Sequence, residues 1–226
     1  HLDALLTSFS TLSVLSLLVY CLPPARRTYL ALSAVFAGLA VANRSPGLFL
    51  VPWASALLLA RAWRGGRTGS ARAWQFVTVR DVFLFGAVAA LTVFAVWPAL
   101  WVHPRRALEG VISGALRQVE NPHEYGNFFW FRIRPDPGPA FYPVVWVFRS
   151  SPLVLLGLVA LVIGRPRRPR AVAAIALVLY VVCFAIMVSG SQKKFDRYLL
   201  PVFPACAVLA AAGYGWLLEA WRRRRS

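Results

Sequence analysis

The sequence predicts an all-α protein that crosses a membrane about six to seven times, with one crossing built as a broken helical hairpin. Three observations support this fold class. Hydrophobic residues make up 59% of the 226 residues, they fall in continuous runs of membrane-crossing length, and the segments between the runs are rich in arginine. A soluble domain of this length could bury a core, but it would not carry so many apolar residues in continuous runs.

Seven apolar runs are predicted as membrane segments. A helix needs about 20 mainly apolar residues to cross the hydrocarbon layer, and several of the runs reach that length. In chain order they cover residues 5–22, 29–42, 48–60, 82–101, 141–163, 171–188 and 199–218. The second and third runs are short, and the turn-forming residues Asn43–Gly47 separate them. We therefore expect these two runs to form the broken hairpin, with a polar tip.

Helix stops and interfacial residues mark the ends of the runs. Trp97, Pro98 and Trp101 close the fourth run. Proline lacks the backbone N–H that continues a helix, and tryptophan favours the membrane interface. Residues 61–80 and 164–170 are rich in arginine and are predicted as loops.

Residues 103–142 form the one long polar connection, with four of the eight acidic residues. Pro104–Val119 is predicted as an amphipathic surface helix, because apolar residues recur at helical spacing: Leu108, Val111, Ile112, Ala115 and Leu116. We interpret Asn127–Phe131 as an aromatic anchor at the interface, with a groove for an acceptor as the alternative. His103 and His123 show no recognised metal-ligand spacing, and we expect them to be solvated.

The distribution of basic residues predicts the orientation of the chain. Residues 23–28, 61–81, 164–170 and the tail after Leu218 hold two, five, four and four of the 25 lysines and arginines. Because basic loops favour the cytoplasmic side, the N-terminus is predicted outside and the C-terminus inside. The same clustering in short loops argues against a nucleic-acid-binding face, although the formal charge is +17.

Ten basic residues remain on the outer side, more than a protein that merely spans a membrane requires. They are Arg44, Arg105, Arg106, Arg117, Arg132, Arg134, Arg149, Lys193, Lys194 and Arg197. Arginine offers phosphate a planar fork, and lysine offers it a compact point charge. From Arg44, Arg149, Lys193, Lys194 and Arg197 we infer a phosphorylated lipid whose headgroup lies at the outer interface.

Plain alternatives stay open for three of the candidate residues. Arg149 interrupts an apolar run just before Pro152, and an ionisable residue in such a run is a functional candidate. Alternatively, the side chains of Arg149 and Arg44 can snorkel to the lipid headgroups. Asp3 stands immediately before the first run. It is either a base or ligand at the mouth of a membrane site, or a helix-start acid that favours the positive end of the dipole.

The segment Gln192–Pro204 holds the densest charge between two runs. Asp196 is expected to be the internal partner of Lys193, Lys194 and Arg197. Tyr198 lies among these charges, which a plain basic loop would not require, although interfacial tyrosine is common.

Five motifs, taken in order, carry a resemblance to a known family. They are Asp3–Thr7, Asn43–Phe49, Asp136–Pro143, Phe148–Leu153 and Lys194–Pro201. The ordered set extends over essentially the whole chain and resembles the GT-C membrane glycosyltransferases. Within them it is closest to the branch, often called family 39, that contains the dolichyl-phosphate-mannose protein mannosyltransferases and the bacterial aminoarabinose transferase.

The resemblance implies an enzyme of a bacterial-type inner or plasma membrane. Such an enzyme moves a sugar, with inversion, from a polyprenyl-phosphate carrier to a protein, lipid or glycan acceptor at the outer face. Asp3 resembles the acid that begins a later span in the family. The family's essential acid in the first outer loop would lie upstream of His1, so we expect the chain to be the C-terminal part of a larger transferase.

Site roles follow from the same resemblance. Arg149, Lys194 and Arg197, together with Arg44, are expected to stabilise the charge that develops on the leaving phosphate. Metal dependence varies within the family, so no cofactor is assigned and a divalent metal ion stays open.

Two other classes of protein remain as alternatives. A phospholipid transporter or flippase would also use broken helices and intramembrane arginine, although no inverted repeat is visible between the halves. A non-catalytic membrane scaffold would leave the outer cations unexplained. An acidic pair in an outer loop upstream of this chain would favour the enzyme.

Overall fold

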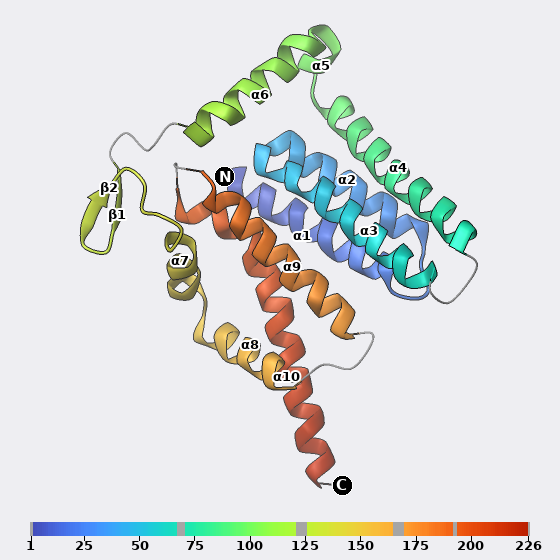
Figure 1. Cartoon of the computed structure of the whole chain (residues 1–226), viewed down its shortest axis with the longest axis vertical. Coiled ribbons are helices and arrows are strands. Elements are labelled where there is room, and N and C mark those ends of the chain that lie inside the picture. Colours follow the sequence, from blue (N-terminus) through green and yellow to red (C-terminus); the bar gives the residue numbers. More distant parts are fainter. Residues whose placement is uncertain (1, 67–70, 121–125, 165–169, 192–193, 226) are drawn as a thin grey trace. The chain divides into compact units, whose positions relative to one another are not determined.

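The computed structural model describes residues 2–66, 71–120, 126–164, 170–191 and 194–225. Within these ranges the chain forms ten α-helices, two 3-10 helices and one antiparallel pair of short strands (Figure 1). The all-α class predicted from the sequence is confirmed. The chain divides into two compact units, His1–Ala115 and Leu116–Ser226.

The first unit contains the N-terminal helices. Their bounds are α1 (Leu2–Cys21), α2 (Arg27–Asn43), η1 (Ser45–Phe49), α3 (Leu50–Gly66), α4 (Ala71–Val96), α5 (Ala99–Val102) and α6 (Pro104–Glu120), and the division between the units falls inside α6. The second unit contains β1 (Asn127–Phe129), β2 (Arg132–Arg134), α7 (Phe141–Arg149), α8 (Pro152–Gly164), α9 (Arg170–Ser189), η2 (Asp196–Val202) and α10 (Phe203–Arg225).

Small residues hold the helices of the first unit together. Between α1 and α2, the hydroxyl of Ser13 donates to the carbonyl of Ser33 at 2.9 Å, and the hydroxyl of Ser33 donates to the carbonyl of Ser13 at 2.8 Å. Gly38 of α2 faces α4 so closely that a Cβ there would lie 2.7 Å from the Cβ of Thr92. Membrane helices associate through such small residues and interhelical hydrogen bonds, because lipid offers no hydrophobic drive between them.

Small residues and an interhelical hydrogen bond also hold the helices of the second unit together. A Cβ on Gly157 of α8 would lie 2.7 Å from the Cβ of Ala210 in α10, and a Cβ on Gly213 would lie 2.7 Å from the backbone nitrogen of Leu161. The hydroxyl of Tyr214 also donates to the carbonyl of Leu153 at 2.6 Å. These contacts bring the backbones of α8 and α10 close together.

Five helical segments of the described chain are long and apolar enough to cross a membrane, as expected of an integral membrane protein. They are Leu2–Cys21, Ser45–Trp63, Val79–Val96, Ala171–Ser189 and Asp196–Arg223. The pair α7 and α8 makes a sixth span if it is taken as one bent unit, and α2 is a shorter apolar helix. The turn between α2 and α3 begins at Arg44, whose backbone is extended, so the predicted break at Asn43–Gly47 is confirmed.

Three of the predicted segment bounds are wrong. The run predicted at residues 48–60 is part of a longer span, Ser45–Trp63, because the 3-10 turn that starts at Ser45-Pro46 continues directly into α3. Residues 61–66 and 71–80 are helical, whereas a loop was expected, since alanine and arginine favour the helix and no proline interrupts them. The fourth run was predicted to extend to residue 101, but the long helix α4 ends at Val96, ahead of Pro98.

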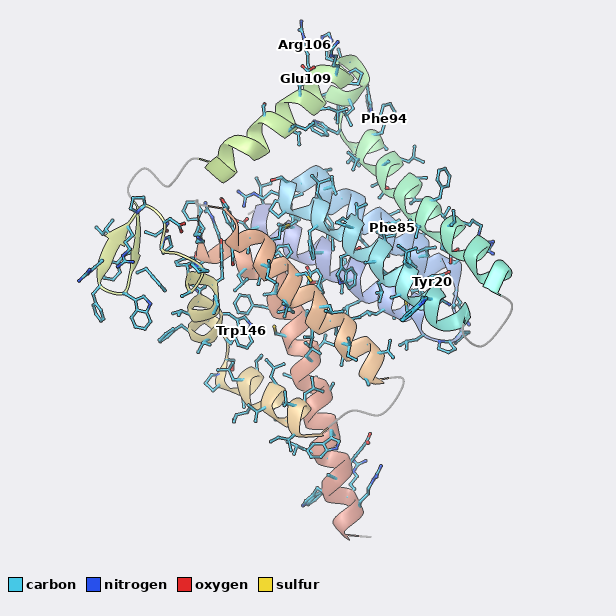
Figure 2. The ribbon with its side chains drawn as sticks, viewed as in Figure 1. Tyr20, Phe85, Phe94, Arg106, Glu109 and Trp146 are labelled. Atoms are coloured by element: carbon cyan, nitrogen blue, oxygen red, sulfur yellow. The ribbon has the colours of Figure 1, made fainter. Side chains whose placement is uncertain are left out.

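The fifth predicted crossing is interrupted by Arg149–Pro152 in the sequence, and the structure confirms that break. The angle was not predicted: α7 and α8 are bent by 108° at Ser150 and Ser151. Ser150 is extended, and Pro152 supplies no N–H to continue α7. The amphipathic helix predicted over Pro104–Val119 is confirmed as α6, on which Arg106 and Glu109 point outward (Figure 2).

Candidate functional site

The candidate site lies in the second unit, where three segments meet at one end of α7 and α10. The first is the loop between β2 and α7, the second is α7 itself, and the third is the chain from Lys194 through η2. The helices hold these segments in place: Trp146 of α7 projects toward α10 and donates its indole N–H to the sulfur of Cys206 at 3.4 Å (Figure 2). On the other side of η2, the hydroxyl of Tyr180 in α9 donates to the carbonyl of Pro201 at 3.4 Å.

Lys194 is a buried cation, and its partner in the structure is Asp136. The lysine side chain is 2% exposed, and its Nζ lies 2.5 Å from Oδ1 of Asp136. The same oxygen accepts the N–H of Gly138 at 2.9 Å, in a turn where Gly138 has a φ of 81° that favours glycine. A charge this deeply buried is costly unless it is paired.

The Asp136 carboxylate is half exposed, and its pKa is lowered. Burial by itself acts to raise that pKa, but hydrogen bonds from Lys194 and from the Gly138 N–H, together with the lysine's charge, outweigh the burial. The carboxylate therefore stays ionised and keeps Lys194 paired.

Arg149 and Asp196 form the second ion pair of the site. The guanidinium of Arg149 is 60% exposed and the carboxylate of Asp196 is 38% exposed, so both can meet a ligand. The other carboxylate oxygen accepts the backbone N–H of Arg197 at 2.7 Å, at the start of η2. One guanidinium nitrogen of Arg149 donates to the carboxylate, and the same group can donate to a phosphate oxygen instead.

Asp196 was expected to be the partner of Lys193, Lys194 and Arg197, and for Lys194 that prediction is wrong. The carboxylate of Asp196 faces Arg149, 47 residues away, while Lys194 pairs with Asp136, 58 residues away. The fold brings these distant groups together, and the local spacing of charges does not reveal it. Lys193 lies outside the described residues.

Arg197 and two aromatic rings complete the cluster. The guanidinium of Arg197 lies 4.6 Å from the centre of the Phe195 ring, and Phe195 meets Tyr198 edge-to-face at 5.3 Å. A cation above an aromatic face is attracted by the ring quadrupole. We refer to Arg149, Lys194 and Arg197, with Asp136 and Asp196, as the charged cluster.

A pocket of about 360 Å³ adjoins the charged cluster. It lies among β1, α7 and the start of η2, and it is lined by Asn127, Phe128, Phe129, Phe141, Val144, Val145, Phe148, Arg149, Phe195 and Asp196. The amide nitrogen of Asn127 is buried and has no hydrogen-bond partner among the described residues. The sequence analysis left an acceptor groove at Asn127–Phe131 as an alternative, and three of those residues line this pocket. The walls from α7 and from the start of η2 were not predicted, because they come from other stretches of the sequence.

The strands β1 and β2 form a hairpin that the sequence analysis missed. Phe128 pairs with Ile133 across it, and the turn residues Trp130 and Phe131 have φ values of 51° and 60°. The sequence signal for this hairpin is weak. Residues 128–131 are four successive aromatic residues with no alternation, aromatic residues are rare in the left-handed region, and no Asn-Gly or Asp-Gly turn marks the site. Trp130 and Phe131 are exposed at the tip of the hairpin. The interpretation of these residues as a membrane anchor stays a prediction.

In the first unit, Asp3 and Arg44 form an ion pair between the start of α1 and the turn after α2. The amide of Asn43 also donates to the carbonyl of Leu2 at 2.7 Å. Both charged side chains are mostly buried. Two residues that the sequence analysis singled out separately are thus partners.

The opposite end of α1 holds a polar contact that was not predicted. The hydroxyl of Tyr20, which is labelled in Figure 2, donates to the buried carboxylate of Asp81 in α4. The guanidinium of Arg61 in α3 lies 4.5 Å from the centre of the Tyr20 ring. Arg80 approaches the same carboxylate at 3.2 Å. This contact joins α1, α3 and α4 at the end of α1 remote from Asp3.

The described residues include no group of three His, Cys, Asp or Glu side chains arranged to hold a metal ion. His103 is exposed at the end of α5, and His123 lies outside the described residues.

Comparison with known proteins does not extend this description. No family model, no curated protein and no solved structure matches the chain.

Proposed function

We propose that this chain belongs to a membrane glycosyltransferase that moves a sugar, with inversion, from a polyprenyl-phosphate carrier to a protein, lipid or glycan acceptor. The charged cluster carries the proposal. Three cations from two separate segments gather at one end of the second unit, and a pocket lies beside them.

The charges in the cluster suit a phosphate that becomes a leaving group. When the bond between the sugar and the phosphate breaks, negative charge develops on the phosphate oxygens, and fixed cations stabilise it. Arg149 is well exposed, and its counter-ion Asp196 is an anion that a phosphate can replace. In this proposal Lys194 adds positive charge from its buried position, where Asp136 holds its ammonium group.

The proposal also assigns an orientation. Asp3 and Arg44 lie at one end of α1, and Tyr20, Arg61 and Asp81 lie at the other. With the arginine-rich residues 61–80 in the cytoplasm, the end that contains Asp3 faces outward. The charged cluster, which precedes the last span, then also faces the outer side.

This orientation can be tested by labelling single cysteines with a membrane-impermeant maleimide in intact cells. The variants are Ser191→Cys near the cluster and, as the control, Ala25→Cys in the exposed turn after α1, both in a background without Cys21, Cys183 and Cys206. Ser191→Cys should label in intact cells and Ala25→Cys only after the membrane is disrupted. The reverse pattern overturns the orientation.

The function itself is tested by transfer. Membranes that contain the full-length protein are incubated with radiolabelled polyprenyl-phosphate sugars, and the label is followed into protein, lipid and glycan fractions. Movement of label that depends on the protein supports the proposal. Retention of all label on the carrier, with every sugar tried, overturns it.

A phospholipid transporter is the second candidate, and the break of 108° between α7 and α8 beside Arg149 favours it. Transporters bind substrates at broken helices of this kind. Reconstituted vesicles with a fluorescent phospholipid separate the two functions, because a transporter would move the lipid between leaflets and a transferase would not.

A further inference from the structure

We propose that the pocket beside the charged cluster binds the sugar ring of the phosphorylated donor. This inference rests on the proposed function and adds to it the place of the sugar. The site lies wholly in the second unit, among β1, α7 and the start of η2.

The size of the pocket favours a single ring. Pockets for small molecules range from about 300 to 1,000 Å³, and this one, at about 360 Å³, is near the lower limit. A long polyprenyl chain would need more room. A monosaccharide is of the size that such a pocket accepts.

The walls supply flat apolar surfaces. Phe129 meets Phe141 edge-to-face with 5.6 Å between the ring centres, and Val144, Val145 and Phe148 follow along α7. The face of an aromatic ring carries partial negative charge, which attracts the weakly positive C–H groups on the apolar face of a pyranose.

Polar groups at the pocket suit the hydroxyls of a sugar. Arg149 has five N–H donors, so it can donate to a phosphate and also to one sugar hydroxyl, while Asp196 is an acceptor for a second hydroxyl. Asn127 adds an amide whose nitrogen is buried without a hydrogen-bond partner in the described chain. A buried donor left unmet is unfavourable, and a sugar oxygen would satisfy it. A lipid chain would use none of these three groups.

Arg149 belongs both to the pocket and to the charged cluster. A phosphate bound by the cluster would therefore lie next to a sugar in the pocket, as the bond between them requires. The carrier chain would then extend away from the pocket.

The test measures binding of small probes to the full chain in lipid nanodiscs. The probes are methyl α-D-mannopyranoside, methyl α-D-glucopyranoside and, for the lipid chain, farnesyl phosphate. Saturation-transfer NMR reports which protons of each probe contact the protein. The key variant is Phe148→Ala, which removes a wall of the pocket at a side chain that is 85% exposed, so the fold is preserved.

Phe131→Ala is the matched control, because Phe131 is 89% exposed and does not line the pocket. We expect at least one glycoside to bind the wild-type protein through its ring protons. Phe148→Ala should weaken that binding about tenfold, and Phe131→Ala should leave it unchanged.

Two outcomes overturn the inference. One is the absence of glycoside binding to the wild-type protein. The other is that Phe148→Ala weakens farnesyl phosphate alone, which would assign the pocket to the lipid chain. The transfer assay decides the proposed function separately. Glycoside binding that depends on Phe148, with no sugar transfer, would support the sugar pocket and refute the transferase.

Discussion

The ammonium of Lys194 is buried against the carboxylate of Asp136, at 2.5 Å, across 58 residues of sequence. This pair fastens the loop that follows the β-hairpin to the segment that leads into η2. The two partners differ in their exposure to solvent: the lysine side chain is 2% exposed and the aspartate side chain is 46% exposed. Loss of the aspartate leaves a buried charge unpaired, whereas loss of the lysine leaves an acid that water can reach.

The first prediction follows from that difference. Asp136→Asn keeps an acceptor for the Gly138 N–H but removes the charge opposite Lys194. Breaking a buried pair from one side costs about 3–5 kcal/mol, and water at the half-exposed position of Asp136 reduces this to about 1–2 kcal/mol. Lys194→Met should cost less. Thermal unfolding in detergent, followed by tryptophan fluorescence, measures both.

The double variant Asp136→Asn/Lys194→Met is the control for this prediction. In the Lys194→Met background no buried cation is left to pair with residue 136. Adding Asp136→Asn should therefore cause almost no further loss of stability. Equal losses from Asp136→Asn in the presence and absence of Lys194 would show that the pair does not stabilise the fold.

The second prediction concerns pH. The pKa of Asp136 is lowered in the folded protein, so its contribution to stability is fully present above its ordinary value of about 3.9. That contribution is lost as the pH falls through the lowered value. The difference in melting temperature between the wild-type protein and Asp136→Asn should therefore be constant from pH 7 to about pH 5 and should shrink below about pH 4.

Glu109→Gln serves as the reference for the pH series, because Glu109 pairs with Arg105 on the exposed surface of α6. Surface pairs of this kind contribute little, so its melting temperature should follow the wild-type protein at every pH. A difference between wild type and Asp136→Asn that persists unchanged at pH 3 would contradict the assigned role of Asp136.

Much of the fold could be predicted from the sequence, because membrane spans leave a strong local signal. Long apolar runs, prolines and arginine-rich ends located most of the helices, and helical spacing located α6. The hairpin escaped because its turn residues, Trp130 and Phe131, occupy a backbone region that their side chains rarely adopt. The bend between α7 and α8 depends on tertiary contacts of α8 with α10 as well as on Pro152.

The candidate site could be predicted only in part. Arg149, Lys194 and Arg197 stood out because charges are conspicuous among apolar residues. Asp196 was singled out as well, but it was assigned to Lys194 and not to Arg149, since pairing depends on distances that the fold sets. Asp136 was the least visible of all, because it lies in a polar loop where an acid is ordinary.

The third prediction addresses Arg149 in the proposed reaction. Arg149→Ala should lower sugar transfer about 100-fold or more, as expected for removal of one group that stabilises developing charge. Arg149→Lys keeps the charge but loses the planar fork, so it should retain more activity than alanine and less than arginine. The measurement is the initial rate of transfer in membranes with matched amounts of protein.

Arg105→Ala is the matched control for Arg149, because Arg105 is an exposed arginine on α6 outside the charged cluster. Its transfer rate should equal that of the wild-type protein. A similar loss in both variants would mean that overall positive charge, and no specific contact of Arg149, supports the reaction. Full activity of Arg149→Ala would remove Arg149 from the site.

The last prediction compares two glycines in α10 that are two residues apart. A Cβ on Gly213 would lie 2.7 Å from the backbone nitrogen of Leu161 and closer still to the carbonyl oxygen of Gly157, whereas a Cβ on Gly215 would meet no atom within 4 Å. Gly213→Ala must therefore push α8 and α10 apart at backbone contacts that cannot yield. Gly215→Ala adds only helix propensity, worth about 0.5–1 kcal/mol of stabilisation. Thermal unfolding should show a lower melting temperature for the first variant and an equal or higher one for the second, and the same change in both would contradict the close packing of α8 on α10.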